Sequence, residues 1–259
     1  MAEKSLTNIL RSEKAFVPYI MAGDGGLNVL MDRLEFLKEQ GATAVELGIP
    51  FSDPVADGPT IQAAGQRALD LGVNLTKIMS ELLSNKERIE IPIILMTYYN
   101  PILQYGVEQF QEICCQIGIA GLIIPDLPLE ESELIREIFQ DTDVCIIQLV
   151  SLTSPPQRIK TIASASEGFV YAVTINGITG ARESFAKELE QHFCAIKQYS
   201  DIPVLAGFGI STADHVQEMN RIADGVVVGS AIVDAFNSGD TEVIKELIRA
   251  KRVPVEVEQ

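Results

Sequence analysis

The sequence is poor in positive charge. Lysine and arginine together number 20, against 36 aspartate and glutamate residues, which gives a formal net charge of −16 at pH 7 and an isoelectric point near 4.5. A chain with this excess of negative charge is repelled by the phosphates of nucleic acids and by anionic membrane surfaces. The composition therefore argues against nucleic-acid binding.

The sequence also lacks the marks of secretion, membrane insertion and disulfide bonding. No apolar run approaches the roughly 20 residues that span a bilayer, and the N-terminus is a polar amphipathic stretch without a basic region ahead of an apolar one. The four cysteines, Cys114, Cys115, Cys145 and Cys194, show no C-x-x-C spacing, and three lie in apolar segments where thiols usually pack as small hydrophobes. We expect a cytoplasmic protein with reduced thiols.

Short apolar segments, in contrast, recur along the whole chain. The chain has 259 residues, which is the usual size of one α/β barrel. Of these residues 47% are hydrophobic, and no linker or low-complexity stretch interrupts them. Eight apolar runs rich in β-branched residues are the predicted strands: 16–21, 44–49, 92–97, 120–125, 144–150, 168–174, 202–208 and 224–230. Segments with helical spacing lie between them, among them 27–40, 107–117, 130–139 and 184–199.

Strict alternation of strands and helices predicts a parallel sheet closed into a barrel. We therefore assign residues 1–259 to a single (β/α)8 TIM-barrel domain. Lys4 to Glu13 is expected to form an extra amphipathic helix over the barrel floor, and residues 253–259 a frayed tail. In such barrels the chemistry lies on the loops that follow the strands, so the strand ends are where functional residues are expected.

Glu46 is a carboxylate inside the second predicted strand. Side chains alternate between the two faces of a strand, so Glu46 shares a face with Ala44 and Gly48. This face is expected to point into the barrel, where the small neighbours would leave room for a ligand. A structural ion pair is the alternative, but no lysine, arginine or histidine falls inside any of the eight strand runs. A buried carboxyl group without a cationic partner has a raised pKa, which suits a general acid or base.

The loop after this strand, PFSDPVADGPTIQ from Pro50, carries two more carboxylates. Asp57 follows Glu46 closely enough for the loop to fold back over the strand end, although a residue before Gly58-Pro59 could also cap the next helix. Asp53 stands before a proline, as turn-forming aspartates often do. Asp126, after the fourth strand, is explained equally well by turn formation, and packing is the default role of Tyr171 on the sixth strand.

Glycine-rich turns follow the last three strands. Gly207-Phe208-Gly209 precedes the possible capping residues Ser211, Thr212 and Asp214, Gly229-Ser230 opens a helix, and Gly177 and Gly180 follow the sixth strand. Main-chain N–H groups and helix N-termini after strands seven and eight form the usual phosphate site of barrels. Each glycine by itself could merely permit a tight turn, but the three loops together predict a phosphate site, with Arg182 as the one basic residue placed to help.

The segment ELGIPFSDPVADGPTIQ from Glu46 closely resembles the signature segment of the tryptophan synthase alpha subunit family. The resemblance continues in FVPYIMAGD from Phe16, TYYNPI from Thr97, IIPDLP from Ile123, NGITGAR from Asn176, GFGIS from Gly207 and VVGSAIV from Val227. It implies retro-aldol cleavage of indole-3-glycerol phosphate to indole and glyceraldehyde 3-phosphate, without a metal or an organic cofactor.

The resemblance also implies residue roles. Glu46 would protonate indole C3 and help move the side-chain hydroxyl proton, and Asp57 would hydrogen-bond the indole N–H. The substrate-binding positions are Tyr19, Met96, Tyr98, Ile123, Leu149, Tyr171, Thr179 and Phe208, and the phosphate-binding positions are Gly180, Gly209, Gly229 and Ser230. Departures from the family pattern are GDGG from Gly23, Tyr19 in place of a common phenylalanine, and Ile175 with Asn176.

A protein partner is implied as well. In the family, positions matching Asp53, Pro54, Asn100, Asp126 and Pro128 meet the pyridoxal-phosphate beta subunit in an α2β2 heterotetramer. The sequence is also compatible with two other functions. One is a different phosphate-binding barrel enzyme, such as a sugar-phosphate isomerase or another aldolase, and the other is a non-catalytic accessory subunit that only binds and activates a partner.

Overall fold

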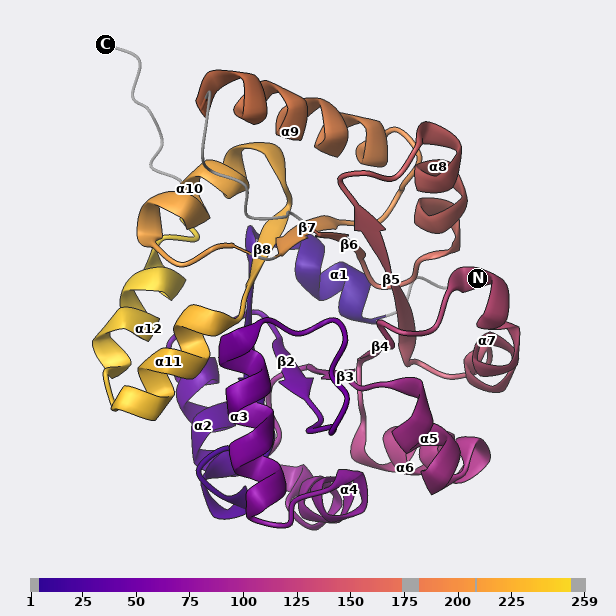
Figure 1. Ribbon diagram of the computed structural model, residues 1–259, viewed down its shortest axis with the longest axis vertical. Helices are drawn as coiled ribbons and strands as arrows, with labels where there is room; N and C mark the ends of the chain where they lie inside the picture. Colours follow the sequence, from indigo (N-terminus) through magenta and orange to yellow (C-terminus); the bar gives the residue numbers. More distant parts are fainter. Residues whose placement is uncertain (1–4, 174–181, 208, 253–259) are drawn as a thin grey trace.

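Eight parallel strands form a closed barrel in the order β1 to β8 (Figure 1). The computed structural model describes residues 5–173, 182–207 and 209–252, with 182–186 as backbone. The strands are β1 Ala15–Met21, β2 Val45–Gly48, β3 Ile93–Met96, β4 Gly121–Ile123, β5 Cys145–Ser151, β6 Val170–Val173, β7 Val204–Gly207 and β8 Gly225–Val228. Each lies within or next to one of the predicted apolar runs, so the predicted TIM barrel is confirmed.

The described helices surround this barrel as a ring, except α1, which lies across one end of the barrel (Figure 1). They are α1 Ser5–Arg11, α2 Leu30–Glu39, α3 Pro59–Asp70, α4 Leu75–Ser84, α5 Tyr99–Tyr105, α6 Val107–Ile117, α7 Glu133–Phe139, α8 Pro156–Ala165, α9 Arg182–Lys197, α10 Ala213–Ile222, α11 Ser230–Ser238 and α12 Thr241–Arg249, with 3₁₀ turns η1 Leu27–Val29, η2 Lys86–Arg88 and η3 Leu129–Glu131. No helix in the part of the chain that the structure describes is long and apolar enough to cross a membrane.

Helix starts differ from the predicted ones where a 3₁₀ turn comes first. The segment predicted as a helix over 130–139 begins as the turn η3, and α7 starts only at Glu133. The Ser132 hydroxyl donates to the Leu129 carbonyl at 2.8 Å and closes that turn. The segment 27–40 likewise opens with η1, whereas the prediction of a helix over 107–117 is confirmed to the residue as α6. The predicted frayed tail, 253–259, lies outside the described residues.

Helix α1 covers the N-terminal end of the barrel, as predicted. Leu6 and Leu10 are fully buried, and the Thr7 hydroxyl donates to the Gly168 carbonyl, just before β6, at 3.1 Å. A side chain on Gly121, the first residue of β4, would approach Leu6 to 3.2 Å. With the floor closed by α1, the interior can open only at the carboxyl ends of the strands.

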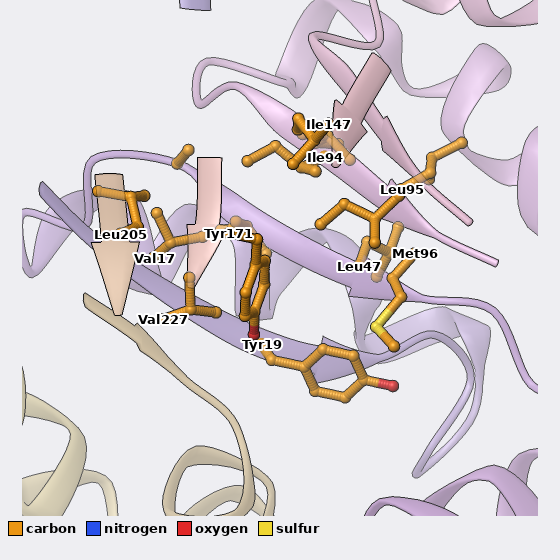
Figure 2. Packing of buried hydrophobic residues seen from close by; sticks show 14 of the residues in the cluster. Val17, Tyr19, Leu47, Ile94, Leu95, Met96, Ile147, Tyr171, Leu205 and Val227 are labelled. Atoms are coloured by element: carbon orange, nitrogen blue, oxygen red, sulfur yellow. The ribbon is translucent and has the colours of Figure 1, made fainter. Parts of the chain in front are cut away.

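The barrel interior is filled by side chains from all around the ring. Figure 2 shows Val17 of β1, Leu205 of β7 and Val227 of β8 converging near Tyr171 of β6. Cys114 and Cys145 pack in the core as expected, but Cys115 is exposed, because on α6 it falls on the helix face away from the barrel.

Candidate active site

A cavity of about 570 Å³ opens among the loops that follow the strands. It brings together nine of the residues predicted to be catalytic, substrate-binding or phosphate-binding: Tyr19, Glu46, Asp57, Met96, Leu149, Tyr171, Gly209, Gly229 and Ser230. Its other lining residues are Ala56, Gly58, Pro59, Ile61, Pro125, Val173, Ile210, Ser211 and Val227. Two carboxylates therefore face a space that is otherwise largely apolar, with glycine and serine at one corner.

Glu46 lies at the base of this cavity without a cation. In β2 it is in register with Tyr19 of β1 and Ile94 of β3, and its side chain is 1% exposed. Its Oε2 has no hydrogen-bond partner among the described residues, and no lysine, arginine or histidine is among the described residues that line the cavity. Burial, with a smaller contribution from the charge of Asp57, raises the pKa of Glu46 from an ordinary value of 4.5 to about 8. At neutral pH this carboxyl group is largely protonated and can give up a proton.

Two glycines on the strands make room for tyrosine rings. A Cβ on Gly48 would lie 1.9 Å from the Tyr19 hydroxyl, and a Cβ on Gly207 would lie 2.2 Å from the Tyr171 ring. The expectation that Gly48 leaves space for a ligand beside Glu46 is therefore wrong, because the Tyr19 ring fills that space. The ligand space lies beyond the rings, where both tyrosines line the cavity.

Asp57 comes to Glu46 from the loop between β2 and α3. The N-cap of α3 is Gly58, which makes no side-chain capping bond, so Asp57 does not take the capping role considered for it. Burial raises the pKa of Asp57 from 3.8 to about 6, and a hydrogen bond from the Tyr98 hydroxyl opposes that rise. Asp57 is thus the group that ionises first, and its charge acts on the Glu46 carboxyl beside it.

The glycine and serine corner has the features of an anion site. Gly209 adopts a φ of 77°, which a residue with a side chain rarely does, and it turns the chain after β7. Helix α11 begins at Ser230, and its N-cap, Gly229, has no side chain to occupy the first amide groups. Of the possible capping residues before α10, Thr212 is the one used, since its hydroxyl accepts from the His215 N–H at 3.2 Å.

Some predicted site residues lie elsewhere. Ile123 is fully buried in β4, and Tyr98 is buried just after β3; neither lines the cavity. Thr179, Gly180 and Phe208 lie outside the described residues. Among the residues that the structure does describe, no group of three or more histidine, cysteine, aspartate and glutamate side chains is arranged to hold a metal ion.

Several lining residues were missed from the sequence. Val173 and Val227 could have been found, because each stands two positions from a predicted site residue, Tyr171 or Gly229, and so shares its face. Pro125 likewise stands two positions from the predicted residue Ile123, whereas Ile61 carries no such signal, because it reaches the cavity from the first turn of α3.

The residues predicted to meet a partner follow β2, β3 and β4. Asp53, Asn100, Asp126 and Pro128 are exposed, and Pro54 is half-buried. The two carboxylates also serve local turns: Asp53 accepts from the Ser52 hydroxyl at 2.6 Å, and Asp126 accepts from the Tyr99 N–H at 2.9 Å. These bonds fit the turn-forming alternative and leave the surface itself open to a partner.

Comparisons with known proteins agree over more than nine-tenths of the chain. A family model of the tryptophan synthase alpha chain matches residues 7–259. The tryptophan synthase alpha chain of Bacillus thuringiensis subsp. konkukian (strain 97-27) is 51% identical over 240 residues, 93% of either chain. Among solved structures, Mycobacterium tuberculosis tryptophan synthase superposes with a TM-score of 0.88 at 32% identity, covering 96% of this chain and 99% of that one. The alpha subunit from Campylobacter jejuni gives 0.86 at 32% identity, over 97% and 100%.

Proposed function

Because the chain belongs to the tryptophan synthase alpha chain family, a family of lyases, we propose that it cleaves indole-3-glycerol phosphate to indole and glyceraldehyde 3-phosphate, the alpha reaction of L-tryptophan biosynthesis. The observation that carries the proposal is the buried Glu46 carboxyl group, largely protonated beside the more acidic Asp57 in one cavity. Incubating the purified chain with indole-3-glycerol phosphate tests it. Indole should form, and its absence would overturn the assignment.

Glu46 supplies the proton that this bond cleavage requires. The ring carbon C3 cannot leave the side chain as a bare carbanion, so it first gains a proton, here from the Glu46 carboxyl group. The carboxylate so formed accepts the proton of the side-chain hydroxyl as the carbon–carbon bond breaks. The hydroxyl carbon becomes the aldehyde of glyceraldehyde 3-phosphate, indole leaves, and Glu46 is protonated again.

Asp57 stabilises the charge that this protonation creates. Adding a proton at C3 turns the ring into a cationic indolenine, with positive charge at its nitrogen. A carboxylate that accepts a hydrogen bond from the indole N–H offsets that charge most strongly in the cation-like transition state. No lysine is among the described lining residues, which argues against a Schiff-base aldolase route.

The phosphate is proposed to bind at the N-terminus of α11 and the turn at Gly209. We expect Ser230→Glu to raise KM about tenfold or more, because a carboxylate there repels the phosphate and occupies its donors. Gly209→Val should act in the same direction by straining the turn. Inhibition by glycerol phosphate should weaken in parallel with substrate binding.

The matched control for the phosphate variants is Asn237→Glu, which adds the same charge to the exposed far end of α11. It should leave KM and inhibition unchanged. If Ser230→Glu and Gly209→Val kept wild-type inhibition by glycerol phosphate, the phosphate would bind elsewhere.

A beta subunit is the proposed partner, in an α2β2 heterotetramer that passes indole between sites. The loop carrying Asp57 is long and turn-rich, so binding over its outer surface could select the conformation in which Asp57 is correctly aimed. We expect the chain to co-elute with a cognate beta subunit and to form indole about tenfold faster or more in the complex. Absence of both effects would overturn the partner proposal and leave the chemistry intact.

The proposed interface can be tested with a pair of surface variants. Asn100→Arg, at the start of α5, should weaken co-elution because a longer charged side chain would stand in the interface. Glu87→Arg, exposed on η2 ahead of β3 and so at the opposite end of the barrel, should have no effect. If both variants co-eluted with the beta subunit to the same extent, the interface would not lie on the loops that follow the strands.

We also propose that the protein is cytoplasmic and that residues 1–259 form a single domain. All four cysteines are free thiols, which supports a cytoplasmic location, where thiols stay reduced. One closed barrel uses strands from Ala15 to Val228, which supports a single domain over 1–259.

A further inference from the structure

Tyr98 touches the loop that carries Asp57 at both ends. Its ring stacks on Phe51, at the start of the loop, with centroids 5.2 Å apart. At the end of the loop its hydroxyl accepts from the Ala56 N–H at 3.0 Å, and hydrogen bonding from this hydroxyl to the neighbouring Asp57 carboxylate lowers the pKa of Asp57. One hydroxyl has one proton to donate and lone pairs to accept with, so both bonds can form together.

The rest of the loop supplies little other support. Its middle is held by turn bonds, from the Val55 N–H to Asp53 at 3.0 Å and from the Asp57 N–H to Pro54 at 3.2 Å. Val55 itself is 82% exposed. At the end of the loop the Gln62 side chain donates to the Asp57 carbonyl at 2.8 Å, so the contacts with Tyr98, together with this bond, fix where the loop lies.

Tyr98 is well placed to impose a position on that loop. It is 2% exposed and directly follows β3 and Thr97. The next residue, Tyr99, donates its N–H to the Asp126 carboxylate at 2.9 Å, which ties this stretch to the turn after β4. Tyr98 is not among the residues that line the cavity, whereas Ala56 and Asp57 are, so Tyr98 acts on the loop without lining the ligand space.

We propose that Tyr98 is a positioning residue of the reaction proposed above: through the Ala56 N–H and its ring contact with Phe51 it fixes both ends of the loop, so that the Asp57 carboxylate is aimed into the cavity. This inference rests on the proposed function for its catalytic consequence, whereas the hydrogen bond itself does not. It also replaces direct substrate contact, the role that the family resemblance implied for Tyr98.

The electrostatic surroundings show what the bond to Tyr98 does. Among the residues that the structure describes, the titratable groups that interact with Asp57 are Glu46 from β2, Tyr19 from β1, Tyr171 from β6 and Tyr98 itself. None of them is a cation. Burial raises the pKa of Asp57, and the hydrogen bond from Tyr98 is what lowers it. Without that hydroxyl, the pKa of Asp57 should rise above its value of about 6.

Tyr98→Phe tests the proposal, because it keeps the ring on Phe51 and removes only the hydroxyl. We expect kcat to fall about tenfold, as for loss of one hydrogen bond to a charged group, with KM within about twofold of wild type. The acid limb of kcat/KM should move to higher pH. Tyr105→Phe, which removes a phenol hydroxyl from α5 outside the cavity, is the matched control and should change none of these values.

A measurement without substrate separates this proposal from the proposed reaction. The carboxyl carbon of Asp57 can be titrated by ¹³C NMR in labelled protein, with its signal assigned by its loss in Asp57→Asn. A higher Asp57 pKa in Tyr98→Phe than in wild type supports the hydrogen bond even if no indole forms, and an unchanged pKa overturns it. A large rise in KM with an unmoved acid limb would restore Tyr98 as a substrate contact and overturn the positioning role.

Discussion

Replacing Glu46 by glutamine is expected to lower kcat for indole formation at least about 100-fold, the usual contribution of a positioned general acid or base. Glutamine has nearly the same shape, so the cavity and its two tyrosines stay in place. Its amide cannot protonate C3 or take the hydroxyl proton. Steady-state indole formation by the isolated chain and by its complex with a beta subunit measures the effect.

The pH profile gives this prediction a second readout. Wild-type kcat/KM should rise as Asp57 ionises, with a pKa of about 6, and fall as Glu46 loses its proton, with a pKa of about 8. Glu46→Gln should lose the basic limb and keep the acid one. If Glu46→Gln kept near-normal turnover, or kept both limbs of the pH profile, Glu46 would not be the catalytic acid.

Folding stability separates a catalytic loss from a structural one. Folding raises the pKa of Glu46 from 4.5 to about 8. The protonated Glu46 therefore favours the folded state fully below pH 4.5, and this contribution to folding stability is lost as the pH rises toward 8. At pH 7 most of that loss is a penalty that the wild-type protein carries. Glu46→Gln lacks this penalty and should be at least as stable as wild type at pH 7 by denaturant unfolding. Glu112→Gln, on the exposed face of α6, is the control for the loss of one carboxyl group. Marked destabilisation of Glu46→Gln would reveal a partner for the carboxylate.

The sequence predicts the barrel and its buried acid because both depend on local patterns. Nearly continuous apolar strands have to be covered on both faces, and the alternation along β2 places Glu46 opposite Val45 and Leu47. The absence of basic residues from the strand runs then argues for an unpaired carboxyl group. These inferences need only the alternation of side chains along a strand and the residue types that the strands contain.

Side-chain directions after the strand ends are harder to predict. Tyr98 and Tyr19 are both tyrosines near barrel strands, yet Tyr98 bonds the loop at Ala56 and Tyr19 lines the cavity. The difference arises because the Tyr19 ring lies over Gly48 of the neighbouring strand, whereas Tyr98 packs on Phe51 of a loop. Such pairings join segments far apart in the chain, and no periodicity encodes them.

The position of Asp57 beside Glu46 lies between these two cases. A separation of eleven residues allows the loop to fold back, but it equally allows Asp57 to cap α3. The choice depends on Tyr98, which supplies a hydrogen bond at the inner side of the loop, and on Gly58, which becomes the N-cap instead. A tertiary contact thus decides between two local options.

Replacing Asp57 by asparagine is expected to leave KM within about threefold of wild type and to lower kcat about 100-fold, because the amide keeps a hydrogen-bond acceptor but not the negative charge that offsets the ring cation. The acid limb near pH 6 should disappear. The basic limb should move to lower pH, since the charge of Asp57 contributes to the raised pKa of Glu46. Asp70→Asn, exposed at the far end of α3, controls for loss of a carboxylate and should behave as wild type. If Asp57→Asn changed only KM, Asp57 would be a binding residue, and the stabilisation of the indolenine would have to come from another group.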